Sequence, residues 1–319
     1  MNDYSIKKIT ADDFKYLIPL MKNCFGDDVN IDYFKWKFLK NPAGLVEGYA
    51  AVTENGEFAA YYGVIPESYS IKGETKIIYQ SCDTMTHSEH RRKGLFRKLA
   101  THCYDELEKE EKLFIIGFSG EMSTPGFLKF GWIHAFNLKN YFIPRKLILP
   151  TPKEQSNVVE LDSLESIEQL ILNSNKQAEI HSNKTLDVYK WRISNPKHEY
   201  KTIAYSSDNG YTAYACYYIE SEKLFLFDFN LIDLKGGKQI LTELKRITKQ
   251  GKLMGIISVV QENSIYSRVL KKLNFISNPL SKGPLSDKIP FIYYTVKDQI
   301  EDYTDPSDWL INSFDHDSM

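Results

Sequence analysis

The sequence predicts a mixed α/β protein built from two tandem domains, and three observations support this prediction. The chain has 319 residues, which is more than one ordinary core holds and enough for two domains of about 150 residues. Hydrophobic residues make up 42% of the chain and charged residues 26%, which is typical of a folded globular protein. Strand-like and helix-like patterns alternate along the chain, and one ordered series of them occurs twice.

Two distant segments share a pattern of aromatic residues, Asn-Pro and Asn-Gly. The pattern occurs at residues 32–37 (DYFKWK), Asn41-Pro42 and Asn55-Gly56, and again at residues 187–192 (DVYKWR), Asn195-Pro196 and Asn209-Gly210. Proline disfavours helical geometry in the residue before it, and Asn-Gly supplies the positive φ angles of a tight hairpin. The pattern therefore predicts, in each half, a short helix that ends before the proline and then a hairpin. A third echo, KFGW at residues 129–132 and KLNF at residues 272–275, predicts a helix end in each half.

The first half supplies a complete series of elements around a central sheet. The expected elements are, in order, a strand at residues 4–9, helices at 11–25 and 32–40, hairpin strands at 49–53 and 58–65, a long strand at 77–86, a helix at 94–110, a strand at 113–118, a short helix at 126–130, and final strands through Ile133 and Tyr141. This order predicts a sheet flanked by helices.

The two predicted domains meet near Pro150. Residues 144–160 carry three prolines and a polar stretch, which is typical of a linker. We therefore expect domains at residues 1–149 and 150–300. Residues 301–319 form an acidic C-terminal tail, which we expect to be loose.

Charge and cysteine content disfavour several classes of function. The formal charge of −2 gives no basic excess for nucleic acid or anionic lipid, so we expect neither partner. No apolar stretch reaches 18 residues, and the polar start MNDYSIKK lacks the core of a signal peptide. The four cysteines are scattered without the spacing of a zinc site or a disulfide framework, so we expect no metal and a cytoplasmic protein.

The most informative local pattern is a strand, a basic loop and a helix. The strand ends at Thr86, the loop carries His90-Arg91-Arg92-Lys93-Gly94, and a helix with apolar residues at helical spacing follows. The free backbone N–H groups and the positive end of a helix favour anions, and Gly94 allows the backbone to approach a phosphate. The arginines add charge and can bind two phosphate oxygens at once. This segment predicts an anion site.

The loop resembles the pyrophosphate-binding motif of the GNAT superfamily of N-acyltransferases, Q/R-x-x-G-x-G/A. Residues 91–96 (RRKGLF) match this motif except at Phe96, where a small residue is usual. The resemblance implies an N-acyltransferase that uses acetyl-CoA or another acyl-CoA. It also implies a mostly antiparallel sheet with a splayed pair of strands in each domain. The residues that it assigns to the cofactor are Met85, Thr86, Arg91, Arg92, Lys93, Gly94, Leu95 and Phe96.

The second half resembles the same fold more faintly and lacks the phosphate loop. Residues 261–264 and 269–275 are similar to the last strand and helix of the family. Where the loop should lie, residues 234–238 (LKGGK) offer two glycines but no arginine. We therefore expect the second half to be a degenerate copy that forms a wall of the substrate site.

The family resemblance implies direct transfer of the acyl group to an amine, without a covalent enzyme intermediate. A backbone N–H near Met85 or Thr86 would face the oxygen that gains charge. A carboxylate or histidine would take the proton of the amine, and the candidates are Asp83, His87 and Glu121. Asp83 is either this base or a structural carboxylate paired with a core arginine, tyrosine or backbone group.

The departing thiolate has no obvious proton donor in the sequence. The family often places a tyrosine where this chain has Phe127. Either the thiolate leaves unassisted, or another hydroxyl such as Ser123 or a tyrosine of the second half donates the proton.

The sequence does not name the acceptor. The added second domain alone motivates the hypothesis of a small polar amine larger than one amino acid, such as an amino sugar or a nucleotide-linked sugar. Two alternatives remain. One is a Fem-like transferase that uses aminoacyl-tRNA, which the net charge and the intact loop disfavour. The other is a sensor that binds CoA without turnover, which the departures at Phe96 and Phe127 motivate. The sequence does not predict the oligomeric state.

Overall fold

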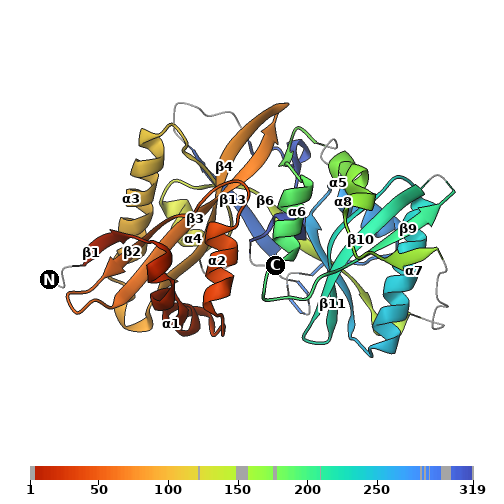
Figure 1. Cartoon of the computed structure of the whole chain (residues 1–319), viewed down its shortest axis with the longest axis horizontal. Helices are drawn as coiled ribbons and strands as arrows, with labels where there is room; N and C mark the ends of the chain where they lie inside the picture. Colours follow the sequence, from red (N-terminus) through yellow and green to blue (C-terminus); the bar gives the residue numbers. More distant parts are fainter. Residues whose placement is uncertain are drawn as a thin grey trace.

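The computed structural model describes residues 4–120, 123–148, 157–174, 178–208, 210–280, 282–283, 285–286, 288–295 and 303–317. It shows two α/β halves side by side, with the chain's last described residues between them (Figure 1). Within these ranges, no helix combines the length and the apolar character that a membrane span requires.

The first half follows the predicted order of elements. Its elements are β1 (Ser5–Lys8), α1 (Phe14–Phe25), α2 (Ile31–Leu39), β2 (Glu47–Val52), β3 (Phe58–Ile71), β4 (Glu74–Thr86), α3 (Leu95–Lys109), β5 (Phe114–Phe118), α4 (Thr124–Lys129) and β6 (Ile133–Pro144). The hairpin of β3 and β4 is longer than predicted, and residues 133–144 form one strand. The tip of the hairpin is polar, so its sequence lacks a strand pattern, but it pairs with β8 of the second half, where Tyr69 lies opposite Ser182.

The second half repeats this series with some insertions. Its elements are β7 (Val158–Glu160), α5 (Glu168–Ser174), β8 (Ile180–Ser182), α6 (Leu186–Ile193), β9 (Lys201–Ser207), β10 (Gly210–Glu220), β11 (Lys223–Leu231), α7 (Leu234–Gln250), β12 (Gly255–Gln261), α8 (Ile265–Lys272), β13 (Lys288–Thr295) and β14 (Trp309–Leu310). The predicted hairpin of this half is present as β9 and β10.

In the described part of the chain, one continuous sheet of 14 strands runs through both halves in the order β1-β2-β3-β4-β5-β13-β6-β12-β11-β10-β9-β7, with β8 and β14 beside it. Most neighbours are antiparallel, as predicted. Each half gives its last strand to the other, because β13 pairs with β5 of the first half and β6 pairs with β12 of the second half. The predicted boundary near Pro150 falls on residues outside the described ranges, and it stays a prediction.

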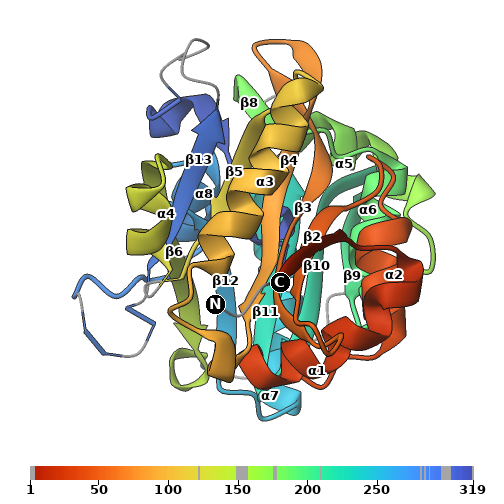
Figure 2. The ribbon, with the colours of Figure 1, turned by 90° about the vertical axis from the view of Figure 1, so that its left-hand side faces the viewer.

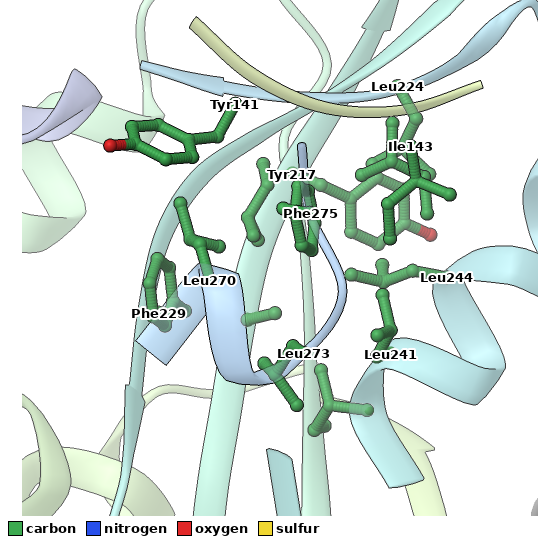
Figure 3. Close-up of a cluster of buried hydrophobic side chains, with 14 of the residues drawn as sticks. Tyr141, Ile143, Tyr217, Leu224, Phe229, Leu241, Leu244, Leu270, Leu273 and Phe275 are labelled. Carbon is green, nitrogen blue, oxygen red and sulfur yellow. The ribbon is translucent and has the colours of Figure 1, made fainter. Parts of the chain in front are cut away.

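The exchange of strands builds a shared core. Tyr141 and Ile143 of β6 pack among side chains of β10, β11, α7 and α8, as Figure 3 shows. Because these residues belong to the first half of the sequence, burial of their apolar surface stabilises the association of the two halves.

Helices cover both faces of the sheet. In the first half, α3 packs on one face and α1 and α2 on the other, since successive residues of β2 and β3 contribute to opposite clusters. In Figure 2, α3 lies in front of the sheet, where it contacts β2, β3 and β4. In the second half, α7 and α8 cover one face and α5 and α6 the other.

The repeated tryptophans make a pseudo-symmetric contact between the halves. Trp36 of α2 stacks on Trp191 of α6, with ring centroids 5.4 Å apart and planes inclined by 21°. Trp36 Nε1 donates to the carbonyl of Trp191 at 2.6 Å, and Trp191 Nε1 donates to the carbonyl of Trp36 at 2.9 Å. The sequence repeat therefore marks equivalent residues that meet across the two halves.

The expectation of a loose C-terminal tail is wrong for residues 303–317. Trp309 is 2% exposed and Phe314 is 2% exposed. The segment pairs with β8 through β14, and Asn312 forms a bridge with Val260 of β12. The apolar residues of this segment lie among acidic residues in the sequence. Its acidic composition therefore led to the prediction of a solvated tail.

Candidate functional site

A cavity of about 770 Å³ lies where the first half's sheet splits open. Strands β4 and β5 are parallel and pair only at Tyr79–Ile115 and Gln80–Ile116, after which they separate. This is the splayed pair that the sequence predicted. The cavity is beyond the carboxyl ends of the paired segments, where ligands bind in open α/β sheets. Its volume falls within the usual range for small-molecule sites, roughly 300–1,000 Å³.

Both halves of the sequence contribute to the cavity wall. One set of lining residues comes from β4, β5, α3 and α4, and a second set from α1, α2 and the C-terminal half of the chain. The lining residues are Ser81, Asp83, Thr84, Phe96, Gly117, Phe118, Ser119, Gly120, Ser123, Gly126, Phe127 and Ile292, together with Met21, Phe25, Asp27, Tyr33, Lys197, His316 and Asp317.

The basic loop between β4 and α3 leaves the N-terminus of α3 free to bind an anion. Arg91, Arg92, Lys93 and Gly94 are exposed. Gly94 is the N-cap residue with φ of 74°, and no side chain caps this helix. Arg92 also has a positive φ, 62°, which is uncommon for a residue other than glycine. Loops of this kind can gather backbone N–H groups around an anion.

The other predicted cofactor residues take different positions. Met85 is 1% exposed and packs with α1 and α2, and Leu95, the first residue of α3, is 3% exposed and packs against the sheet. Neither they nor Thr86 line the cavity. The carbonyl of Thr86 accepts a hydrogen bond from Arg91 Nε at 3.4 Å, which ties the loop to the end of β4. A role for Met85 or Thr86 through their backbone N–H groups stays a prediction.

Phe96 and Phe127, the two departures from the family pattern, lie together at the cavity. Their rings meet edge to face with centroids 5.1 Å apart, and Phe127 also contacts Trp132. The bulk of Phe96 therefore packs against aromatic neighbours beside the start of α3. Ser123 lines the same region and donates to the carbonyl of Gly120 at 3.1 Å.

Asp83 lies at a bulge of β4 and forms an ion pair. The sequence did not decide whether this carboxylate has such a partner. Its φ is 47°, and the register of β4 against β3 shifts beside it. Lys37 Nζ of α2 lies 2.8 Å from Asp83 Oδ2 and 2.8 Å from Asp317 Oδ2, so one buried lysine serves two carboxylates. Tyr33 OH donates to Asp83 Oδ1 at 3.4 Å.

The carboxylates of this group have different proton affinities. Burial raises the pKa of Asp83, and the repulsion of Asp317 adds to this, against the opposing attraction of Lys37. Burial also acts to raise the pKa of Asp317, but Lys37 and His316 outweigh it, so the pKa of Asp317 is below its usual value. Burial lowers the pKa of His316 to about 4, so this imidazole is neutral near pH 7. Asp83 is thus the carboxylate that takes up a proton more readily.

His87 and Glu121, the other candidate bases, do not join this group in the structure. Glu121 lies outside the described residues. His87 does not line the cavity, and it forms a cluster with Glu57 and His90 in which the possible ligand atoms all lie within 4.8 Å of one another. This cluster could hold a metal ion, and it assembles only in the fold because Glu57 comes from the β2–β3 hairpin.

Sequence reasoning missed Lys37, His316 and Asp317. Lys37 stands in an ordinary amphipathic helix, and the other two stand in the segment taken for a tail. One signal was available: Lys37 is equivalent to Arg192 in the internal repeat, and both are buried. Arg192 donates to the carbonyls of Phe314 and His316. The repeat therefore places two cations around the C-terminal segment.

The equivalent place in the second half is closed. Strands β11 and β12 pair only at Leu224–Ile256 and Phe225–Ile257 and then separate, like β4 and β5. The chain's own C-terminal segment occupies this opening, since Ser313 bonds to Val259 of β12 and Asn312 bonds to Asp228 of β11.

The N-terminus of α7 also differs from that of α3. The Asp233 side chain accepts a hydrogen bond from the backbone N–H of Gly236 at 2.7 Å, so a carboxylate already caps this helix. A Cβ atom on Gly236 would approach Ala213 Cβ to 3.0 Å, which shows that this glycine allows close packing of α7 on the sheet. Close packing of α7 on the sheet therefore explains a glycine in residues 234–238 without a bound anion.

Comparison with known proteins agrees with this geometry. Residues 5–135 match the family model of the acetyltransferase (GNAT) domain. A probable N-acyltransferase from Enterococcus faecalis V583 is similar over 92% of this chain and 73% of its own, with a TM-score of 0.69 and 12% identity. A GCN5-related N-acetyltransferase from Anabaena variabilis is similar over 91% and 72%, with a TM-score of 0.66 and 12% identity.

A eukaryotic enzyme has the same architecture. Saccharomyces cerevisiae N-myristoyltransferase, solved with bound myristoyl-CoA, is similar over 97% of this chain and 85% of its own, with a TM-score of 0.65 and 12% identity. A search of curated protein sequences gave no match. The cofactor of the GNAT family is acetyl-CoA or another acyl-CoA. Residues 5–135 therefore match the acetyltransferase (GNAT) domain, and the whole chain shares the fold of these solved structures.

Proposed function

We propose that this chain transfers an acyl group, in the first instance acetyl, directly from acyl-CoA to a primary amine of a small polar metabolite. One observation carries the proposal: the cavity at the split between β4 and β5 lies beside a helix N-terminus that is free of a side-chain cap and follows three exposed cations. In the second half, the C-terminal segment fills the split between β11 and β12, and Asp233 caps the N-terminus of α7. Among the described residues, the first half alone therefore offers this arrangement.

The residues present suit an acyl-CoA. Arg91, Arg92 and Lys93 would bind its phosphates together with the N–H groups at the start of α3. About half of the residues that line the cavity beyond are aromatic, aliphatic or glycine, which suits an apolar arm and an acyl group. The thioester supplies the activated acyl group, and the residues of this chain orient it and exclude water.

The residues of the cavity would then prepare the amine. Asp83, whose pKa is raised by burial, would accept a proton from the ammonium form of the acceptor. The N–H groups of β4 that face the gap have no β5 partner after Gln80, so backbone near Met85 or Thr86 is our proposed donor to the acyl oxygen. Ser123 is the hydroxyl from our predictions that lines the cavity, and we propose it as the donor to the leaving thiolate.

An amino sugar or a nucleotide-linked sugar is our proposed class of acceptor. The cavity is larger than an acetyl group requires, and polar groups of both halves, including Asp27, Tyr33 and Lys197, line it. The four cysteines are free, which fits our proposal that the reaction takes place in the cytoplasm.

Thermal unfolding with saturating acetyl-CoA tests the first step. At about a hundred times the dissociation constant, acetyl-CoA should stabilise the protein by roughly 2.7 kcal/mol, while an adenine nucleotide alone should do less. A panel of amino sugars and other amines, followed by release of the CoA thiol, then tests transfer. Binding without any turnover would favour a sensor, and transfer from aminoacyl-tRNA would favour a Fem-like enzyme.

Charge reversal in the loop should weaken acyl-CoA binding. We expect Arg92→Glu to raise the dissociation constant of acetyl-CoA at least tenfold, about 1.4 kcal/mol, because it places a carboxylate beside the phosphates. Lys109→Glu, at the other end of α3, is the matched control and should change the constant less than twofold. Calorimetric titration measures both, and an unchanged affinity in Arg92→Glu would refute the phosphate site.

A further inference from the structure

We propose that Asp317, from the C-terminal segment, forms with Asp83 a carboxylate pair that binds the acceptor amine in its cationic form. This inference rests on the proposed function and deepens it by naming the charge of the acceptor and a residue that contacts it. Asp83 comes from β4 of the first half and Asp317 from the C-terminal segment, and both line the cavity. The acceptor end of the site is therefore completed by residues that follow the second half.

The fold holds Asp317 at this place through several contacts. The side chain of Gln80, on β4, donates to the carbonyl of Asp315 at 2.8 Å and accepts from the backbone N–H of Asp317 at 2.8 Å. Arg192 donates to the carbonyl of His316 at 2.6 Å, and the His316 ring stacks on Phe118 of β5 with centroids 4.6 Å apart. The segment is thus anchored to both strands of the split, β4 and β5.

The pair lies among other charged groups at the cavity. The three lining carboxylates are Asp27, Asp83 and Asp317. Lys197 lies 2.6 Å from Asp27, so this cation is matched by its own carboxylate. Lys37 is shared between Asp83 and Asp317, and Arg192 also attracts Asp317. A carboxylate oxygen has more than one lone pair, so Asp83 Oδ2 can accept from the ammonium group of the acceptor in addition to Lys37 Nζ.

The proton balance of the reaction agrees with this arrangement. Acyl transfer forms the amide C–N bond and breaks the thioester C–S bond. The acceptor ammonium loses two protons: the carboxylate pair takes the first and passes it to solvent, and the second leaves with the thiolate as the CoA thiol. No further reactant is needed. Asp317 would hold the ammonium while Asp83, the more readily protonated of the two, takes the proton.

Binding of a charged probe amine and its uncharged analogue tests the pair without turnover. We expect the CoA-saturated protein to bind protonated glucosamine at least tenfold more tightly than glucose in calorimetry at pH 6.5. Asp317→Asn should remove this preference and leave the dissociation constant of acetyl-CoA within twofold. Asp305→Asn is the matched control, because it removes a carboxylate from the same segment outside the cavity and retains a capping side chain.

Kinetics separate this inference from the proposed function. For the best acceptor of the amine panel, Asp317→Asn should lower kcat/KM at least a hundredfold and raise KM at least tenfold. Formate, at tens of millimolar, should partly restore kcat/KM in Asp317→Ala, a rescue that a merely structural role would not give. Full activity and full glucosamine binding in Asp317→Asn would overturn the inference, as would equal binding of glucose and glucosamine by the unaltered protein. Preferential binding of glucosamine with no transfer to any amine would overturn the proposed function and leave the pair standing.

Discussion

Asp83→Asn is expected to lower kcat/KM for the acceptor at least a hundredfold and to leave the dissociation constant of acetyl-CoA within twofold. Asparagine keeps the shape of the side chain and leaves Lys37 paired with Asp317, but it cannot accept the proton of the amine. Loss of a general base typically costs a factor of 10² to 10⁴. Release of the CoA thiol measures the rate, and thermal unfolding verifies that the variant is folded.

The pH profile gives an independent signature of Asp83. Because burial raises its pKa, the ionised base is lost as the pH falls through a value above the ordinary range of an aspartate. The acid limb of kcat/KM should therefore lie above that range, and it should disappear in Asp83→Asn. Asp32→Asn on the exposed face of α2 is the control and should keep both the rate and the acid limb. Unimpaired transfer by Asp83→Asn would assign Asp83 to structure alone.

Lys37→Met is expected to lower the free energy of unfolding by about 3–5 kcal/mol, because it leaves two buried carboxylates without their cation. The Lys37 side chain is 0% exposed, and each of the two carboxylate side chains is 8% exposed. The ammonium is held charged because its pKa is well above the usual value, the attraction of Asp317 and Asp83 outweighing the effect of burial. Urea unfolding at pH 7 measures the change.

Lys35→Met in the same helix is the matched control for this prediction. The Lys35 side chain is 47% exposed and pairs with the exposed Asp32, so its loss should change the free energy of unfolding by less than about 0.5 kcal/mol. A loss below 1 kcal/mol in Lys37→Met would show that the three charged groups are not coupled in the folded protein.

Much of the fold could be predicted from local sequence because helix, turn and strand patterns depend on near neighbours. The Asn-Gly turn at Asn55-Gly56 produced its hairpin, with Gly56 at a φ of 82°. The repeat of Trp36 and Trp191 marked two equivalent helices, but not that they stack on each other. Strand exchange could not be predicted, because β6 and β13 would satisfy the same pattern of burial if each stayed in its own half.

The candidate site also has a part that local sequence predicts and a part that depends on long-range contacts. The basic loop of residues 91–94 is a local structure, and its cations and the helix that follows it could be predicted from the sequence. The charged neighbours of Asp83 could not be predicted, because Lys37 lies 46 residues before Asp83 and Asp317 lies 234 residues after it. Only long-range contacts decide whether such a carboxylate is paired.

The sequence by itself determined the duplication, the order of the elements and the basic loop that leads to the GNAT resemblance. The tertiary structure decided which half keeps an open site, because the C-terminal segment fills the split of β11 and β12 and leaves that of β4 and β5 open. It also decided which charged groups meet in the cavity. The physical reason is that backbone propensities act over a few residues, whereas ion pairs and packing join residues that are distant in the chain.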